Sequence, residues 1–224
     1  IRSSKRVSNP GCHATAFILS LYPLIDHKVM PEDYPVSCQS ITGYSGGGKS
    51  LIEKYEVSSK NNPYTKAPRP YSLGLNHKHL KEMMMHSGLR ESPIVADYYK
   101  GLATIIPIHT RLLSQKLDGR GLHMLLAEHY KNQHFVKVMP YIDKTGLMDG
   151  SINSMIYSEG CIFDGGLDIT ACNDTNRAEI FVMGNDEAGI AMIVTRLDNL
   201  GKGASGAAIQ NMNLMLDYDE KLNL

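Results

Sequence analysis

Strand-like segments are concentrated in the middle of the chain, whereas helical patterns lie towards both ends, and this order constrains the fold most. Strands are expected over residues 36–42, within 94–108, and over 136–139, 167–170, 178–183 and 189–197. Helices are expected over residues 12–22, 50–57, 77–86, 121–132 and 203–218. Pro23 should end the first helix, because the residue before a proline avoids helical angles. We therefore predict an α/β (α+β) domain with a mixed or antiparallel sheet flanked by helices.

Composition narrows the class of protein. The 224 residues include 23 Lys plus Arg and 23 Asp plus Glu, so the net charge is zero and nothing favours nucleic-acid binding. We find no apolar run of the roughly 18 residues that a membrane span needs and no secretion-signal pattern. The four cysteines form no C-x-x-C pair, which predicts no metal site and reduced thiols in a cytoplasmic protein. The cysteines are Cys12, Cys38, Cys161 and Cys172.

A glycine-rich segment, G-Y-S-G-G-G-K-S at residues 43–50, fits the phosphate-binding loop of nucleoside triphosphatases. The expected strand before it and helix after it suit that motif. However, Asn61-Asn62-Pro63 soon interrupts the helix, and no strand ending in Asp supplies a magnesium ligand. A nucleotide-binding module of this kind is kept as an alternative from a different functional class.

Two further motif matches are weaker. Gly43 to Gly47 also fits the G-x-S-x-G elbow of serine hydrolases, with Ser45, Asp97 and His109 in the required order, but no H-G-G-G oxyanion motif is present. Gly201 to Gly206 fits G-x-G-x-x-G, the dinucleotide-binding fingerprint. That fingerprint needs a second strand and an acidic residue about 20 positions on, and the sequence has only 18 residues after Gly206. Close helix packing by small residues explains the second match.

Cys12 is the candidate nucleophile. It follows Asn9-Pro10-Gly11 at the first turn of an expected helix, where the helix dipole favours a thiolate. A thiolate suits acyl transfer, although a buried structural cysteine fits the pattern equally well. His109 is the candidate base, because it ends the apolar strand segment 104–108. His77 and His79 lie two positions apart and cannot share one helix face, so a helical metal site is not expected.

Six blocks in this order resemble the shorter form of N-acetyl-γ-glutamyl-phosphate reductase. The blocks are N-P-G-C-H-A-T-A (9–16), G-Y-S-G-G-G-K (43–49), H-K-H-L-K-E (77–82), I-P-I-H (106–109), T-N-R-A-E (175–179) and D-N-L-G-K-G-A-S-G-A (198–207). The resemblance covers essentially the whole chain. That family is related to aspartate-semialdehyde and glyceraldehyde-3-phosphate dehydrogenases, so the resemblance implies a glyceraldehyde-3-phosphate dehydrogenase-like catalytic domain.

The resemblance also implies residue roles. Cys12 matches the catalytic nucleophile and His109 the catalytic histidine. The positions matching NADP(H)-binding segments are Ser45, Gly46, Gly47, Asn199, Gly201, Lys202 and Gly203. Candidates for anchoring the substrate are Lys49, His77, His79, Glu82 and Arg177. The implied reaction is NADPH-dependent reduction of a small acyl phosphate through a Cys12 thioester, in arginine biosynthesis; the alternative substrate is the aminoadipyl analogue of lysine biosynthesis.

The resemblance implies a domain arrangement as well. Residues 1–11 would be the remnant of an NADP-binding Rossmann domain, and 12–197 the catalytic and dimerisation domain of a homodimer or homotetramer. Residues 198–224 would form a helix that packs back on the cofactor domain. Without that domain, we expect this helix to expose Met212, Leu214 and Met215, and the chain alone to be unable to turn over.

Overall fold

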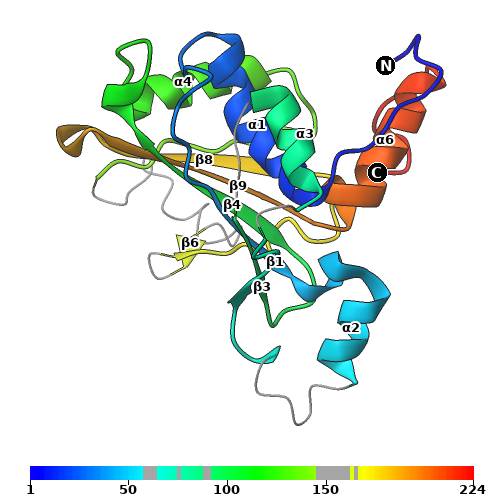
Figure 1. Ribbon diagram of the computed structural model, residues 1–224. Helices are drawn as coiled ribbons and strands as arrows, with labels where there is room; N and C mark the ends of the chain where they lie inside the picture. The colour runs from blue at the N-terminus through cyan, green and yellow to red at the C-terminus, as the bar shows by residue number, and fades with distance from the viewer. Residues whose placement is uncertain (58–64, 75–76, 88–91, 145–161, 164–165) are drawn as a thin grey trace.

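The computed structural model describes residues 1–57, 65–74, 77–87, 92–144, 162–163 and 166–224. Within them, a seven-stranded sheet has the order β2-β3-β1-β4-β9-β8-β5 (Figure 1). Its strands are β1 Gln39–Gly43, β2 Arg69–Pro70, β3 Ser92–Ala96, β4 Leu102–His109, β5 Val136–Val138, β8 Ala178–Asn185 and β9 Ile190–Leu197. β1 pairs with β3 and β5 pairs with β8 in parallel, and the other pairings are antiparallel. The predicted mixed sheet flanked by helices is confirmed.

In the described part of the chain, helices cover one face of this sheet (Figure 1). They are α1 Cys12–Asp26, α3 His79–Ser87 and α4 Gly119–Tyr130. α1 packs on β4 and β9, α4 packs on β8 and β5, and α3 packs on α1. Phe17, Leu21 and Leu122 are fully buried against Ile106 and Ile193 of the sheet. Burying such side chains supplies the main driving force for this arrangement.

Helix α1 does not end at Pro23, as predicted, but continues to Asp26 with Pro23 inside it. A proline in a helix removes the hydrogen bond to the carbonyl four residues earlier, here that of Leu19. The hydroxyl of Tyr130, from α4, donates a hydrogen bond of 2.9 Å to this Leu19 carbonyl. A tertiary contact thus replaces the missing bond, which explains why the helix passes through the proline.

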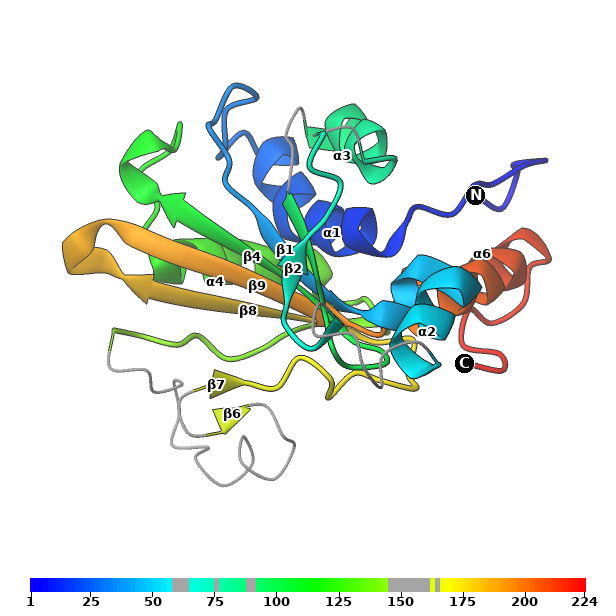
Figure 2. The same ribbon diagram turned by 60° about the horizontal axis from the view of Figure 1, so that its bottom comes forward.

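Several other predicted elements are shorter in the structure or are divided into two. The segment 94–108 divides into β3 and β4, with Gly101 between them at φ +121°, an angle that favours glycine. The expected strand at 167–170 is reduced to β7 Gly166–Leu167, which pairs with β6 Ile162–Phe163 (Figure 2). The expected helix at 203–218 is a π-helical turn, Gly201–Ser205, followed by α6 Gly206–Met215.

The two remaining helices lie near one end of the sheet (Figures 1 and 2). α2 Gly48–Glu56 follows β1, and α6 follows β9. The N-terminal segment runs beside α6, where Asn211 donates a 2.6 Å hydrogen bond to Asn9. On α6, Met212 is 51% exposed, whereas Leu214 and Met215 are half-buried. None of the helices in the described ranges combines the length and apolarity that crossing a membrane requires.

Candidate functional site

Cys12 is the first residue of α1 and follows Gly11, whose backbone is extended. The first turn of α1 contains no acidic residue, so no side chain of the helix itself offsets the positive end of the helix dipole. Cys12 packs beside Leu102 and Leu197, at the ends of β4 and β9 that meet the π-helical turn. Gly203 of that turn touches Cys12, since a Cβ on Gly203 would lie 2.6 Å from the Cβ of Cys12. Only glycine permits this approach.

His13 follows Cys12 and is 1% exposed. Its Nδ1 lies 2.5 Å from the Oγ of Ser40 on β1, and its Nε2 lies 2.8 Å from the hydroxyl of Tyr71. Both ring nitrogens therefore have hydroxyl partners, which fix the orientation of the imidazole beside the thiol.

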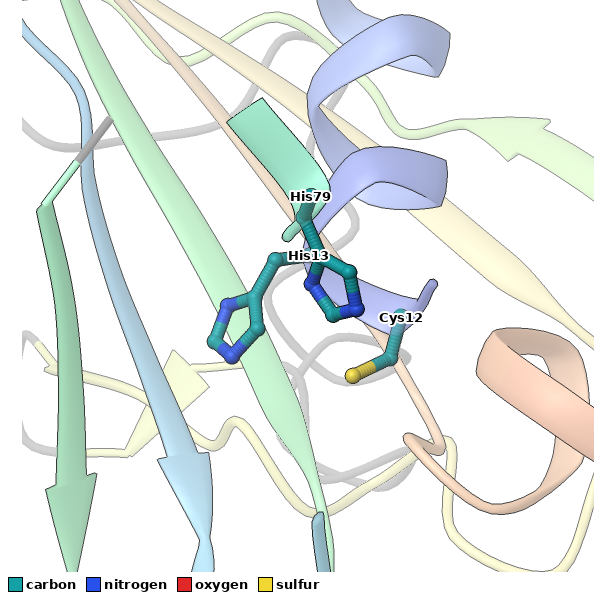
Figure 3. Close-up of side chains that lie close together, drawn as sticks. All are labelled: Cys12, His13 and His79. Atoms are coloured by element: carbon teal, nitrogen blue, oxygen red, sulfur yellow. The ribbon is translucent and has the colours of Figure 1, made fainter. Parts of the chain in front are cut away.

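His79, the first residue of α3, is the third member of a cluster with Cys12 and His13. One potential ligand atom from each of the three side chains lies within 4.8 Å of the others. Figure 3 shows the two imidazoles and the thiol close together. His79 is 5% exposed, and its Nδ1 is buried without a hydrogen-bond partner among the described residues. The sequence separates His79 from Cys12, and the packing of α3 on α1 joins them.

Burial and mutual repulsion keep these imidazoles neutral. Burial first, then the proximity of His79 and His77, lowers the pKa of His13 to about 3. Burial, followed by His77 and Lys78, lowers the pKa of His79 to about 4. Burial also lowers the pKa of His77, and Glu82 partly opposes this shift. At neutral pH His79 is therefore in its neutral form, with a ring-nitrogen lone pair, which is the form from which a general base acts.

Glu82 connects α3 to the turn that carries Cys12. Its Oε2 accepts a 2.7 Å hydrogen bond from the backbone N–H of Gly11. The space between α3 and this turn is filled, because a Cβ on Gly11 would lie 1.9 Å from the Nε2 of His79. The carboxylate therefore holds the nucleophile's turn against the histidine.

A pocket of about 990 Å³ opens beside the cluster. Nine of the positions predicted from the sequence line it: Cys12, Ser45, Gly46, Gly47, His77, His79, Glu82, Asn199 and Gly203. The pocket is also lined by residues to which no role was predicted, among them His13, Arg69, Tyr71 and Lys78. Adjacency to Cys12 was the only signal for His13. For Arg69 and Tyr71, in a proline-containing loop segment, the sequence offered none.

Asn199 joins three elements at the back of the pocket. Its side-chain amide donates a 3.0 Å hydrogen bond to the Oγ of Ser45, and its Oδ1 accepts one of 2.8 Å from the N–H of Gly101. Asn199 is 2% exposed, so losing either bond would leave a buried polar group unsatisfied. This residue fixes the glycine-rich loop relative to the turn that contacts Cys12.

The structure does not favour a phosphate-binding loop at residues 43–50. The N–H groups of Gly43, Tyr44 and Ser45 donate to the backbone carbonyls of Gly101, Tyr98 and Tyr99. These amides are therefore not available to a phosphate, and residues Tyr44–Gly47 form a 3-10 turn in place of an open phosphate-binding loop. The hydrolase alternative is not assembled either, because Ser45 pairs with Asn199 and His109 lies elsewhere.

His109 is not part of this site, which corrects the sequence prediction. It lies exposed at the far end of β4, opposite Ile190 of β9. The other end of β4, Leu102, packs near Cys12. Eight residues of strand separate the two ends by about 23 Å. Within the site it is His79, not His109, that neighbours the thiol.

Four other predicted positions lie outside the pocket lining. Lys49 is exposed on α2. Arg177 forms an ion pair with Glu179, with 2.9 Å between its Nε and the carboxylate. Lys202 is buried, and its ammonium donates a 2.6 Å hydrogen bond to Gln210, while a Cβ on the neighbouring Gly201 would lie 2.4 Å from the Thr175 carbonyl. Arg177, Lys202 and Gly201 therefore make structural contacts outside the pocket lining.

Comparison with known proteins gives consistent matches. Residues 12–199 match the family model described as semialdehyde dehydrogenase, dimerisation domain. The chain is 40% identical, over all of its length and 67% of the relative's, to N-acetyl-gamma-glutamyl-phosphate reductase 2 of Nostoc sp.. It is 38% identical to N-acetyl-gamma-glutamyl-phosphate reductase of Burkholderia cenocepacia, over 96% of this chain and 64% of that one. The chain thus spans about two thirds of the length of these relatives.

Solved structures with the same fold are more distant in sequence. Aspartate semialdehyde dehydrogenase II from Vibrio cholerae, complexed with ASA, superposes with a TM-score of 0.63 at 12% identity, covering 94% of this chain and 62% of that one. The aspartate semialdehyde dehydrogenase from Francisella tularensis gives a TM-score of 0.62 at 13% identity, covering 92% and 64%. These likenesses concern the fold.

Proposed function

This chain belongs to the N-acetyl-γ-glutamyl-phosphate reductase family of semialdehyde dehydrogenases, and we propose that it carries the thiol-dependent catalytic part of such a reductase. The reaction is the NADPH-dependent conversion of N-acetyl-γ-glutamyl phosphate into the semialdehyde, a step of arginine biosynthesis. One observation carries the proposal: Cys12, at a helix N-terminus, shares a pocket with a buried neutral histidine whose ring lies against the same turn.

The first half of the proposed reaction is acyl transfer to Cys12. His79 accepts the thiol proton, and the resulting sulfur attacks the acyl carbon. The carbon–sulfur bond forms as the bond to the phosphate oxygen breaks, so inorganic phosphate leaves and a thioester remains on Cys12. The N-terminus of α1 favours the negative sulfur, and its first backbone N–H groups, which no side chain caps, would stabilise an oxyanion.

The second half reduces the thioester. NADPH, when bound, supplies a hydride to the acyl carbon. His79 then returns its proton to the sulfur as the carbon–sulfur bond breaks, which releases the aldehyde and restores the thiol. His13 is held between Ser40 and Tyr71, so its ring keeps a fixed orientation in the pocket beside the thiol.

We propose that the glycine-lined wall of the pocket receives a flat nicotinamide ring. Gly203 touches Cys12, and a Cβ on Gly46 would lie 3.6 Å from the amide nitrogen of Asn199. Both glycines line the pocket, so larger side chains at these positions would take up part of its volume. Asn199 would hold this wall in place. The described residues would contact the reactive end of the cofactor.

The substrate's anionic groups would meet two cations. Arg69 and Lys78 line the same pocket as the histidines. A guanidinium suits a carboxylate or phosphate particularly well, because its planar donors can bind two oxygens at once. We propose that Arg69 and Lys78 anchor the carboxylate and phosphate of the substrate, in place of Lys49 and Arg177.

The family model's description also supports assembly as a homodimer.

The test is the reverse reaction in the full-length protein. Phosphate-dependent oxidation of N-acetylglutamate semialdehyde should produce NADPH absorbance with the wild type, and the rate should vanish with Cys12→Ala. His109→Gln is the matched control, because His109 lies at the other end of β4 and should keep wild-type activity. Activity in Cys12→Ala, or its loss in His109→Gln with the fold intact, would contradict the proposed site.

A further inference from the structure

Cys12, His13 and His79 bring a thiol and two imidazoles within 4.8 Å of one another, and these are ligand types that a soft divalent metal ion prefers. We propose that this cluster binds such an ion, with Zn²⁺ as the natural example, and that metal binding removes Cys12 from catalysis. The proposal uses the site of the proposed function but does not depend on the reductase chemistry.

The spacing of the three side chains is close to that of a metal site. Their ligand atoms lie within 4.8 Å of one another. Around tetrahedral Zn²⁺ with ordinary bond lengths, sulfur and nitrogen ligands lie about 3.3 to 3.7 Å apart. Small side-chain rotations close that difference. Two ligands come from the first turn of α1 and the third from the start of α3, so the helices fix their relative positions.

His79 supplies an independent indication of a ligand. His79 is only 5% exposed, and its Nδ1 has no hydrogen-bond partner among the described residues. Buried polar atoms in proteins are nearly always paired, so an unsatisfied ring nitrogen within a cluster of metal-ligand types indicates a group that binds there.

His13 is prepared for coordination by its two hydroxyl neighbours. Ser40 contacts one ring nitrogen and Tyr71 the other. A metal-bound histidine characteristically keeps a hydrogen bond on its second nitrogen, which fixes its tautomer and orientation. A metal ion would replace one hydroxyl contact and retain the other. The fourth position would face the pocket, where water or substrate could occupy it.

Coordination requires the thiolate, so each ion that binds releases one proton from the Cys12 thiol to solvent as the metal–sulfur bond forms. The sulfur lone pair is then shared with the metal and cannot attack an acyl carbon. The bound metal is therefore a reversible inhibitor, and a chelator restores the thiol.

The first experiment is a titration of the chain with Co²⁺, without substrate or NADPH. We expect one equivalent to bind with strong visible bands of a tetrahedral site and a near-ultraviolet thiolate-to-cobalt band, both displaced by Zn²⁺. Cys12→Ser should abolish the thiolate band, and His79→Gln should weaken Co²⁺ binding about ten-fold or more. His109→Gln is the matched histidine control and should bind Co²⁺ as the wild type does. An unchanged thiolate band in Cys12→Ser, or none in the wild type, would overturn the proposal.

A second measurement needs no variant at the site. Zn²⁺ should slow alkylation of Cys12 by iodoacetamide at least ten-fold, as read by peptide mass spectrometry, and a chelator should reverse the protection. A Cys161→Ser background removes a thiol that lies outside the described residues. Equal alkylation rates with and without Zn²⁺ would overturn the proposal even if the enzyme were active. Protection in an inactive enzyme would support the metal site and contradict only the reductase function.

Discussion

The carboxylate of Glu82 accepts a 2.7 Å hydrogen bond from the backbone N–H of Gly11, the residue immediately before Cys12. This bond crosses from α3 to the first turn of α1 and brings His79 to the nucleophile. The position of the thiol therefore depends on a side chain that does no chemistry itself.

Glu82→Ala should lower kcat by about ten- to one hundred-fold, because small displacements of a nucleophile are costly. Glu82→Gln retains an acceptor oxygen for Gly11 and should keep most of the activity. Steady-state kinetics of the full-length protein would measure both variants. Equal losses in the two would show that the charge of Glu82, and not its hydrogen bond, is what matters.

Gly203→Ala should displace Cys12, since the added Cβ would lie 2.6 Å from the Cβ of Cys12. We expect slower alkylation of Cys12 and a large loss of kcat, with only a moderate drop in thermal stability. Iodoacetamide kinetics and circular dichroism melting would separate these effects. Ala204→Gly, at the next position of the same turn, is the control for altered backbone freedom. A Gly203→Ala variant with normal thiol reactivity would contradict the described contact.

The features that were predicted correctly depend on residues that are close together in the sequence. The helix after Cys12 and the helix after residues 43–47 follow from neighbouring residues, and both were predicted. Pro23 was misjudged because the replacement donor, Tyr130, comes from another helix. His109 was misjudged because an apolar strand ending in histidine does not reveal which end faces Cys12. The pairing of His79 with Cys12 depends on α3 packing on α1, which no sequence spacing reveals.

Tyr130→Phe should destabilise the fold by about 1 to 3 kcal/mol, because it leaves the partly buried Leu19 carbonyl without this donor. Pro23→Ala restores the backbone N–H that can reach this carbonyl within the helix. In the Pro23→Ala background, the cost of Tyr130→Phe should therefore be smaller. Urea unfolding of the four chains in this double-mutant cycle gives the coupling energy. A coupling energy of zero would mean that Tyr130 does not compensate for the proline.

Lys202 predicts a pH dependence of stability. Burial lowers the pKa of its ammonium from 10.5 in the unfolded chain to about 8, against a smaller opposing effect of Glu220. Between these values the unfolded chain binds more protons, so the contribution of Lys202 to the free energy of unfolding rises with pH, by up to about 3 kcal/mol. Lys202→Met should remove this rise. Unfolding between pH 7 and 10.5 would test it, and an unchanged slope in the variant would contradict the assignment.

The central claim, that Cys12 is the acyl acceptor of this pocket, can be tested on the chain itself without cofactor. The protein would be incubated with N-acetyl-γ-glutamyl phosphate in the absence of NADPH, then analysed by intact and peptide mass spectrometry. We predict one N-acetylglutamyl group per chain, attached to Cys12, labile to hydroxylamine and absent in Cys12→Ala. No adduct on the folded wild type, or the same adduct in Cys12→Ala, would contradict the claim.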